Sequence, residues 1–546
     1  MTVAAHAQTL AELLLRAAEQ SPDRDVLVFP DQRMTYGELL ASARKVAKCL
    51  MAVGVQPGDH VGIYLPNSFD FVEVMFGVAL AGGVTVPVNG RYVSKELAYL
   101  TENADLVTIV TFGHVADSVS YIERLKRALP NLAGAADCEN LSLPEAPKLR
   151  NVIAMGQREH AGCVGRRAFL ACEDRVSDAE LDARIAGITP EDMALILYTS
   201  GTTSNPKGCL IPHGAICSNS QALGVDRYKL TASDNFWSPL PIFHIAGILP
   251  LCAVMHAVGG YIMMPYFDAG QALDLLENEG ATAAYPCFVT IMQDLINHPS
   301  FYDRDLSKVR LMNSNFAVQP PEIKEAMAKA MPNTIQVGTY GLSEASGTIS
   351  TSYLDDSYAA RTEKLGSPLR GWEIRVIDPE TGADRPTGAR GEIIAKGPGM
   401  LTGYYKDPEK TAETIDEGGW LHTGDVGSLD ADGRIMFHGR LKDMLKIGGE
   451  NVAASEIESH LESHPAVKLA QVVSVPHQRL QEVAAAFIEF KPGQSVSDEE
   501  LISHCKGEIA SFKVPRYVRA VDEWPMSTSK IQKFKLRDGL VAELGL

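Results

Sequence analysis

Hydrophobic positions in the first half of the chain follow two alternating patterns. The segments 10–20 and 69–83 carry apolar residues at helical spacing, whereas 60–66 and 84–89 are short, nearly continuous apolar runs. The first pattern predicts amphipathic helices, and the second predicts strands that are buried on both faces. Their alternation indicates α/β units around covered sheets. The segment 134–181 is less periodic, and we predict that it is largely loop.

The pattern changes near Gly371, where short strand-like runs are separated by turns rich in Pro, Gly and Asp. These β-type runs are 372–378, 388–397 and 433–440. Mixed patterns return after residue 440. They predict helices at 454–465 and 497–509 and strands at 470–476 and 482–490. We therefore predict two domains, an N-terminal domain over 1–440 and a C-terminal domain over 441–546.

Composition narrows the class of protein. The 546 residues are 45% hydrophobic and 22% charged, as expected for a water-soluble protein of more than one domain. A net charge of −18 argues against nucleic acid or an anionic membrane as the main partner. We expect no transmembrane segment and no secretory signal. The nine scattered cysteines contain no CxxC pair, which argues against disulfides or zinc and favours a cytoplasmic location.

The segment 197–208 (LYTSGTTSNPKG) is the first candidate for chemistry. The apolar run 193–198 predicts a buried strand, and the loop that follows offers Gly201, several hydroxyls and then Lys207. Many weak donors converging on one place suit phosphate oxygens. A polar surface loop is the alternative, but the lysine favours phosphate. The segment is not a Walker A loop, because Lys207 is followed by Gly-Cys and no hydroxyl is placed to hold Mg²⁺.

Four later segments are weaker candidates when each is taken alone. In 340–347, Tyr340 could stack on a base, Ser343 could donate to a phosphate and Glu344 could bind Mg²⁺, although such turns are common. Asp425 follows Thr-Gly and could accept ribose hydroxyls, or it could be an ordinary turn residue.

The other two segments are rich in basic residues. The segment 439–452 contains Arg440, Lys442 and Lys446 before Gly448 and Gly449. The segment 525–538 contains Lys530, Lys533 and Lys535. Runs of charge are usually solvated surface, so neither segment decides a function by itself.

The order of these segments is specific. A hydroxyl-rich loop, then PxxxFHxxG, YGxSE, TGD, GRxKDxxKxGGxNV and a terminal lysine follow one another along the chain, within a family-like stretch from about 34 to 538. In this the chain resembles the acyl-adenylate-forming (AMP-binding) superfamily, and in particular its acyl-CoA synthetases and aryl-CoA ligases. The resemblance implies an α/β fold class. It predicts a large N-terminal domain of two α/β sheets plus a β-rich subdomain, and a small mobile α+β C-terminal domain.

The resemblance also implies a role for each matching residue. The nucleotide would be bound by Thr199, Ser200, Gly201, Thr202, Thr203, Lys207, Tyr340, Gly341, Ser343, Asp425 and Arg440, and Mg²⁺ by Glu344. The catalytic candidates are Lys530, His244 and Lys446, with Lys442 as the hinge. Gly448 and Gly449 would contact coenzyme A. The acid pocket would include His244, Phe288, Asn315, Phe316 and Thr339.

The implied reaction has two steps. Lys530 would lie between the acid carboxylate and the α-phosphate of ATP, where it offsets their repulsion as an acyl-adenylate forms. Rotation at Lys442 would then withdraw Lys530 and bring 446–451 to the site for attack by the CoA thiol. The cofactors and substrates implied are ATP, Mg²⁺, coenzyme A and a small carboxylic acid, and a homodimer would be compatible with the family.

Three positions depart from the family pattern. Ser204 replaces a glycine in the phosphate loop but keeps a donor there. Pro525 precedes Lys530 by five residues instead of six, which leaves Lys533 as the alternative lysine. Phe316 replaces a small residue, and we expect it to narrow the acid pocket in favour of compact or medium-length acids.

The expected function is therefore that of an AMP-forming acyl-CoA synthetase for a medium-chain, alicyclic or aromatic acid. Two alternatives stay open at this point. One is a freestanding adenylation enzyme that loads a carrier protein, although Phe243-His244 differs from the aspartate of amino-acid activators. The other is a nucleotide-binding pseudoenzyme, which the intact Lys207, Glu344, Asp425 and Arg440 oppose.

Overall fold

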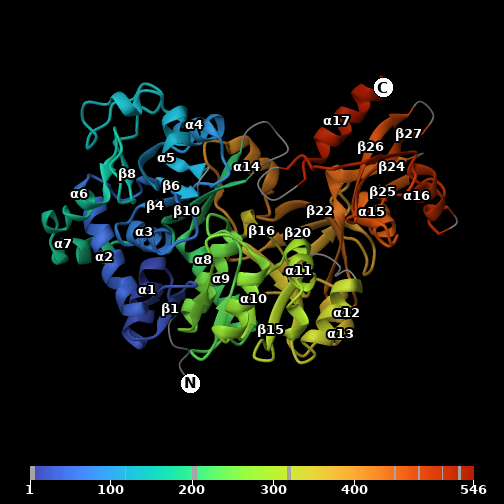
Figure 1. Cartoon of the computed structure of the whole chain (residues 1–546), viewed down its shortest axis with the longest axis horizontal. Coiled ribbons are helices and arrows are strands. Elements are labelled where there is room, and N and C mark those ends of the chain that lie inside the picture. The colour runs from blue at the N-terminus through green and yellow to red at the C-terminus, as the bar shows by residue number, and fades with distance from the viewer. Residues whose placement is uncertain are drawn as a thin grey trace. The chain divides into compact units, whose positions relative to one another are not determined.

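The computed structural model describes residues 6–116, 119–199, 206–315, 321–447, 450–477, 480–506, 508–526 and 531–546 (Figure 1). The chain divides into two compact units. Unit 1 comprises Met1–Glu373 and Ala395–Leu421, and unit 2 comprises Ile374–Ile394 and His422–Leu546. Unit 2 thus includes part of the β-rich segment, and the functional boundary at 440 stays a prediction.

One sheet of unit 1 has eight strands. In order they are β21 (Gly403–Tyr404), β11 (Lys207–Pro212), β10 (Met193–Thr199), β4 (Val84–Pro87), β3 (His60–Tyr64), β5 (Leu106–Thr111), β8 (Asn151–Ala154) and β9 (Val164–Gly165). The strands from β10 to β9 pair in parallel, whereas β11 and β21 are antiparallel at one edge. Every residue of β4 and β5 is buried, as parallel strands covered on both faces require.

The second sheet of unit 1 has nine strands. In order they are β18 (Ser367–Pro368), β17 (Gly347–Thr351), β16 (Ile335–Leu342), β15 (Leu311–Asn315), β14 (Ala283–Ala284), β12 (Asn235–Trp237), β13 (Gly260–Ile262), β1 (Asp25–Val28) and β2 (Arg33–Thr35). The strands from β16 to β1 are parallel, so their carboxyl ends lie at one edge. A separate small hairpin consists of β6 (His114–Ala116) and β7 (Val119–Ser120).

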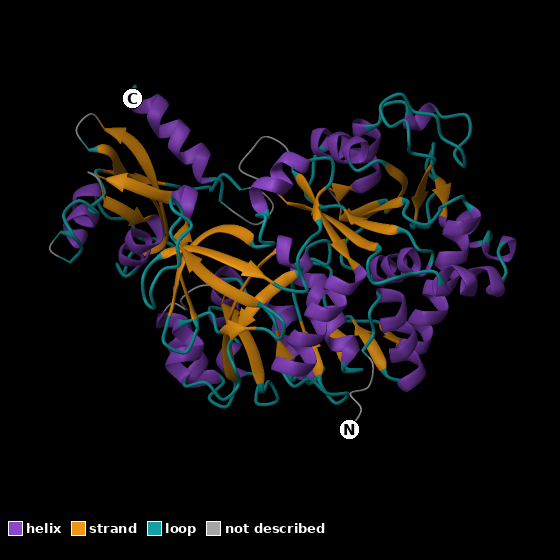
Figure 2. Ribbon diagram, turned by 180° about the vertical axis from the view of Figure 1, so that it is seen from behind, coloured by secondary structure: helices purple, strands orange, loops and turns teal. Residues whose placement is uncertain are grey.

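Helices cover these sheets (Figure 2). Those of unit 1 are α1 (Leu10–Gln20), α2 (Tyr36–Ala52), α3 (Phe69–Leu80), α4 (Ser94–Asn103), α5 (Tyr121–Ala128), α6 (Arg166–Leu170), α7 (Asp178–Ala186), α8 (His213–Gln221), α9 (Ile245–His256), α10 (Ala269–Asn278), α11 (Val289–Ile296), α12 (Pro321–Ala330), α13 (Tyr358–Glu363) and α14 (Pro408–Thr414). Residues that cap the first turn mark where several of these helices begin. For example, Thr35 and Glu38 form a capping box at the start of α2.

Two of these helices join the sheets. Helix α8 contacts β10 and β11, α9 contacts β13 and β17, and the two helices contact each other. They therefore form a layer between the sheets. Nearly every residue of α9 is buried, which explains why its apolar residues surround the helix instead of forming one stripe.

Unit 2 contains most residues of a four-stranded sheet and a separate five-stranded sheet. The first has the order β19 (Glu373–Ile377), β20 (Gly391–Lys396), β22 (Leu421–Leu429) and β23 (Ile435–Arg440). The second has the order β25 (Glu450–Ala453), β24 (Met444–Ile447), β27 (Gln481–Phe490) and β26 (Val467–His477), with β28 (Tyr517–Ala520) beside β27. Its helices are α15 (Ala454–Glu462), α16 (Asp498–Cys505) and α17 (Lys533–Leu544).

These elements confirm the predicted α/β class, with two α/β sheets, a β-rich part and a small α+β C-terminal part. The predicted helix 10–20 and the strands near 60, 84 and 193 are present with nearly the expected bounds. The prediction that 134–181 is largely loop missed β8, whose four residues are all buried and pair in parallel with β5. A four-residue strand that begins with a polar residue carries too little periodicity to be found in the sequence. No helix in the described parts of the chain is long and apolar enough to span a lipid bilayer.

Candidate active site

The phosphate-loop candidate is the connection of a β-hairpin. Strands β10 and β11 pair so that Thr199 lies opposite Lys207, one residue at each end of the connection. Ser200, Gly201, Thr202 and Thr203 lie outside the described residues. The sequence folds in this way because an apolar strand is followed by a polar connection and then a second apolar strand, which is the pattern of a hairpin.

Lys207 has two partners near the end of β21. Its Nζ lies 3.7 Å from Oδ2 of Asp407 and 5.9 Å from the centre of the Tyr404 ring. Because Tyr404 pairs with Cys209 of β11, the lysine and the aromatic ring stand on adjacent strands. The side chain of Lys207 is partly buried and is therefore restrained before any ligand binds.

Glu344 lies in a short 3₁₀ turn, Ser343–Ala345, directly after β16. Its Oε1 accepts a hydrogen bond of 2.9 Å from the Tyr404 hydroxyl. Burial, and after it the negative charge of Glu344, raise the pKa of Tyr404 above its usual range, so this hydroxyl stays a donor. Tyr340 is buried in β16 on the approach to the turn.

Gly341 is required by the close approach of the chain after β16. A Cβ atom at this position would lie 1.9 Å from the carbonyl oxygen of Gly347. Gly347 itself has φ +99°, a left-handed conformation that favours glycine. The two glycines therefore allow the tight turn that presents Ser343 and Glu344.

Asn219 of α8 anchors this turn and was not identified from the sequence. Its Nδ2 lies within hydrogen-bond distance of the carbonyl oxygens of Ala345, Ser346 and Thr348, at 2.9–3.1 Å. Its Oδ1 accepts a bond of 2.9 Å from Nε1 of Trp372. Asn219 is fully buried. In the sequence it stands beside Ser218, Ser220 and Gln221, so no pattern distinguishes it from its polar neighbours.

The acid-pocket candidates follow neighbouring strands of the nine-stranded sheet. His244 follows β12 and caps α9, Phe288 follows β14 and caps α11, and Asn315 ends β15. Because β12, β14, β15 and β16 are parallel neighbours, these positions and Glu344 lie at one edge of the sheet. In open α/β sheets this carboxyl edge is where ligands bind.

The local surroundings of these candidates differ. His244 is partly buried, and its ring centre lies 4.7 Å from that of Phe243. Thr339 is fully buried; its hydroxyl accepts a hydrogen bond from Asn313 at 2.6 Å and donates to Thr351 at 2.9 Å. The Thr339 hydroxyl is thus used inside the protein. Phe316 lies outside the described residues.

Asp425 and Arg440 form a pair within unit 2. They lie opposite each other on β22 and β23, and Arg440 Nε is 3.2 Å from Asp425 Oδ1. Asp425 is only 4% exposed, and its backbone N–H donates to the Thr423 hydroxyl at 3.1 Å. A buried carboxylate with an arginine beside it is a restrained acceptor for hydroxyl groups.

The remaining candidates also belong to unit 2. Lys442 lies in the 3₁₀ turn Leu441–Asp443, and Lys446 lies in β24 opposite Asn451 of β25. Gly448, Gly449 and Lys530 lie outside the described residues. Lys533 is the alternative to Lys530. Its Nζ lies 2.6 Å from Oε1 of Glu458, so its ammonium group already has an ion-pair partner.

The described residues include no group of three or more His, Cys, Asp or Glu side chains that could hold a metal ion. A magnesium ion that travels with a nucleotide does not need such a group, since one or two carboxylates, the phosphates and water suffice. Glu344, a carboxylate fixed by a hydrogen bond beside a hydroxyl residue, fits that mode of binding.

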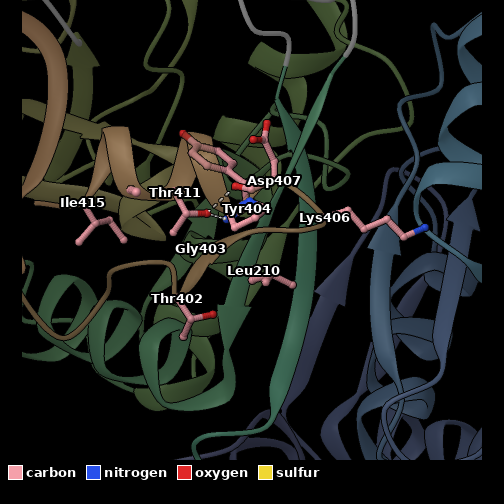
Figure 3. A pocket seen from close by; sticks show the side chains of 10 residues that line it. Leu210, Thr402, Gly403, Tyr404, Lys406, Asp407, Thr411 and Ile415 are labelled. Atoms are coloured by element: carbon pink, nitrogen blue, oxygen red, sulfur yellow. Dashed lines mark hydrogen bonds between the residues drawn. The ribbon is translucent and has the colours of Figure 1, made fainter.

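A hollow of about 520 Å³ opens beside β21 (Figure 3). Its wall consists of Leu210, Thr402, Gly403, Tyr404, Lys406, Asp407, Pro408, Thr411, Ala412 and Ile415. Neither Lys207 nor Glu344 lines it, and we assign it no part in the chemistry.

The chain matches two family models. The model described as "AMP-binding enzyme" matches residues 14–405, and that described as "AMP-binding enzyme C-terminal domain" matches residues 456–530.

Named relatives cover nearly the whole chain. It is 35% identical over 542 residues to a putative acyl-CoA synthetase, YngI, of Bacillus subtilis, with 98% of each chain covered. It is 32% identical to a methyl-dioxo-octahydro-inden-4-yl-propanoyl:CoA ligase of Rhodococcus jostii, with 97% of this chain and 98% of that protein covered. Among solved structures, the chain is similar to the crystal structure of the anthranilate CoA ligase AuaEII in complex with anthranoyl-AMP, with a TM-score of 0.86 and 25% sequence identity. The alignment covers 99% of this chain and 98% of that chain.

Proposed function

The chain belongs to the AMP-binding enzyme family and is an AMP-forming carboxylate–CoA ligase, and we propose that its acid is medium-chain, alicyclic or aromatic. The enzyme uses ATP to convert the acid to an acyl-adenylate and then transfers the acyl group to coenzyme A, releasing pyrophosphate and AMP. The observation that carries this conclusion is the match of both family models together with CoA ligases that align over nearly the whole chain.

The ATP phosphates are assigned to the connection between β10 and β11. Thr199 and Lys207 stand at its two ends, which supports a loop that closes over the β- and γ-phosphates. The loop residues Ser200, Gly201, Thr202 and Thr203 would donate to these oxygens. Lys207 would offset negative charge on the departing pyrophosphate, and its place between Asp407 and Tyr404 supports this role because it restrains the ammonium group.

The turn after β16 is assigned to the nucleotide and its metal ion. Tyr340 and Gly341 would contact adenine, and Ser343 would donate to the α-phosphate. Glu344 would hold Mg²⁺, which when bound neutralises phosphate charge. Asp425 and Arg440 would accept and donate hydrogen bonds at the ribose, and their ion pair supports a preformed site.

The first chemical step would be attack of the acid carboxylate on the α-phosphorus. Lys530 would lie between these two anionic groups and stabilise the charge that shifts between them. His244, at the start of α9, would orient the acid, with Phe288, Asn315, Phe316 and Thr339 as the pocket. The engaged hydroxyl of Thr339 supports a role in shaping the pocket and not in hydrogen bonding to the acid.

The second step would need a different part of the C-terminal domain. Lys442 would act as the hinge, and Lys446, Gly448 and Gly449 would approach coenzyme A after rotation. The position of Lys442 in a short 3₁₀ turn between β23 and β24 supports a hinge, because hinges are commonly a few residues at the ends of elements. A homodimer and a cytoplasmic location are further predictions.

One assay tests both the identity of the acid and the identity of the acyl acceptor. It measures the release of pyrophosphate from ATP, in the presence of Mg²⁺, for a panel of acids, each with and without coenzyme A. We expect turnover that requires coenzyme A and yields a thioester, with highest kcat/KM for a medium-chain, alicyclic or aromatic acid. Turnover that is indifferent to coenzyme A would instead favour a carrier protein as the acceptor, and long straight-chain acids as the best substrates would contradict the proposed pocket.

A further inference from the structure

Tyr404 contacts both Lys207 and Glu344. Its hydroxyl donates to Glu344 Oε1 at 2.9 Å, and its ring lies 5.9 Å from Lys207 Nζ. These two charged groups belong to different sheets, since Lys207 begins β11 and Glu344 follows β16. One side chain thus connects the phosphate-loop hairpin with the turn that carries the acidic residue.

The backbone around Tyr404 is fixed from several sides. Its N–H donates to the Thr411 hydroxyl at 2.8 Å, and the N–H of Tyr405 donates to the Gly208 carbonyl at 2.8 Å. The N–H of Leu401 donates to the Glu344 carbonyl, also at 2.8 Å. The segment is therefore bonded to both the hairpin and the turn, and a side chain on it has little freedom to move.

The direction of the side chain supports a specific role. Figure 3 shows Tyr404 on the same side of the turn as Asp407, which pairs with Lys207, whereas Lys406 extends the other way. Lys406 reaches Asp105, with Nζ 2.9 Å from Oδ1. The turn thus sends Tyr404 and Asp407 toward the charged groups and Lys406 away from them.

The chemistry of the contact suits a metal-binding carboxylate. A carboxylate offers about four lone-pair directions, so one hydrogen bond to Oε1 leaves room for a cation. Carboxylates that bind metal ions are commonly held by such a second hydrogen bond, which fixes their orientation. Above an aromatic face, a lysine ammonium group is attracted without being neutralised.

We propose that Tyr404 is a positioning residue, which holds Glu344 in the orientation that binds Mg²⁺ and restrains Lys207 for the phosphates. This inference rests on the proposed function, because it takes Glu344 as the metal ligand and Lys207 as the phosphate ligand. It adds a residue outside the motifs that the sequence singled out.

The neighbouring Tyr405 provides a matched control. Its hydroxyl donates to Asp105 at 2.8 Å, so it also makes one hydrogen bond to a carboxylate. It differs in that no contact with Lys207 or Glu344 is described for it. Tyr404→Phe and Tyr405→Phe therefore each remove one phenol hydroxyl from the same turn, and only the first removes it from Glu344.

The test measures ATP binding by titration calorimetry without acid substrate, once with Mg²⁺ and once with EDTA. Loss of a hydrogen bond to a metal ligand typically lowers metal affinity about 10- to 100-fold. We therefore expect the factor by which Mg²⁺ increases ATP affinity to be at least about tenfold smaller in Tyr404→Phe than in the wild type. Binding in EDTA should change less than about twofold, since Phe keeps the ring over Lys207. Tyr405→Phe should match the wild type in both titrations.

A second substitution tests the ring. Tyr404→Leu removes the aromatic face as well, and we expect ATP binding in EDTA to weaken a further two- to fivefold, roughly the value of an exposed cation–π contact. Thermal melting of each variant identifies any general loss of structure.

Three outcomes would overturn the proposal. An unchanged Mg²⁺ effect in Tyr404→Phe, with a wild type that does show the effect, would reject the positioning role and leave the proposed function intact. Equal losses in Tyr404→Phe and Tyr405→Phe would assign the effect to the turn as a whole. A wild type whose ATP binding ignores Mg²⁺ would reject the metal role of Glu344, and the role of Tyr404 with it.

Discussion

At the scale of single residues, the candidate site contains charged groups that the protein itself restrains. Asp425 is buried beside Arg440, and Lys207 lies between Asp407 and an aromatic ring. A preformed arrangement costs less ordering entropy when the ligand arrives. Lys207, Glu344 and Asp425 could be proposed from the sequence because the order of their motifs resembles that of the acyl-adenylate-forming superfamily. The partners of Lys207 and Glu344 could not be proposed, because Tyr404 and Asp407 lie far from them along the chain.

Substitution of Asp425 should weaken nucleotide binding. In Asp425→Asn the charged acceptor for the ribose is lost, and we expect the half-saturating ATP concentration to rise about 10- to 100-fold, the value of a hydrogen bond to a charged group. Steady-state kinetics with varied ATP measures this effect. Asp384→Asn is the control, because Asp384 is 64% exposed and pairs only at the surface with Arg375. Similar kinetic changes in the two variants would contradict the ribose assignment.

At the scale of elements, the turn after β16 is held by a helix from the layer between the sheets. Asn219 of α8 bonds three carbonyl groups of this turn region and the indole of Trp372. The spacing of apolar residues predicts where helices and strands form, but it does not show which carbonyl groups a buried side-chain amide will bond. That information depends on contacts between residues more than a hundred positions apart. The hairpin of β10 and β11 was predictable because its pairing is local.

Replacement of Asn219 by leucine should destabilise unit 1. Asn219→Leu leaves the bonded carbonyls and the Trp372 N–H buried without that partner, and we expect a loss of about 3–5 kcal/mol in the free energy of unfolding. Chemical denaturation with tryptophan fluorescence measures this change. Asn278→Leu, on an exposed position of α10, should stay within about 0.5 kcal/mol. A destabilisation of Asn219→Leu no larger than that of the control would contradict the anchoring role.

Glu462, the last residue of helix α15, should make the free energy of unfolding depend on pH. Burial, with the neighbouring charge of Glu458, raises the pKa of Glu462 to about 7, while Lys533 and a hydrogen bond from the Ala470 N–H act in the opposite direction. Because the folded state favours the protonated acid, folding is favoured below the unfolded pKa of about 4.5, and this stabilisation is lost as pH rises through about 7.

The matching prediction is that Glu462→Gln stabilises unit 2 at alkaline pH. Glutamine cannot ionise, so the variant should exceed the wild type by roughly 1–3 kcal/mol at pH 8.5 and by less at pH 6. Denaturant unfolding at the two pH values measures the difference. An advantage that is equal at both pH values, or larger at pH 6, would contradict a raised pKa of Glu462 in the folded state.

At the scale of the whole molecule, the two chemical steps are assigned to different segments of the C-terminal domain. In this proposal Lys530 would serve the first step and the segment after Lys446 the second, with Lys442 as the hinge. Composition and the order of motifs were enough to predict the enzyme class and the fold. The identity of the acid was not predictable, because pocket shape depends on side chains from several strands of one sheet.

A proline at the hinge should separate the two steps. Lys442→Pro fixes φ near −65° and removes a backbone N–H, so rotation should be restricted. We expect acyl-adenylate formation within about threefold of the wild type and thioester formation from acyl-adenylate slowed at least about tenfold. Single-turnover assays of each half-reaction distinguish the steps. Lys442→Ala is the control and should leave both steps nearly unchanged, whereas equal slowing of both steps by the proline would contradict a hinge at this position.

In the first step of the reaction, the acid carboxylate attacks the α-phosphorus of ATP. The most direct measurement uses an acid labelled with ¹⁸O in its carboxylate, followed by mass spectrometry of the products after turnover with coenzyme A. An acyl-adenylate route leaves one ¹⁸O atom in AMP, because a carboxylate oxygen stays on phosphorus when the thiol displaces AMP. Label in inorganic phosphate, or AMP without label, would contradict the acyl-adenylate mechanism.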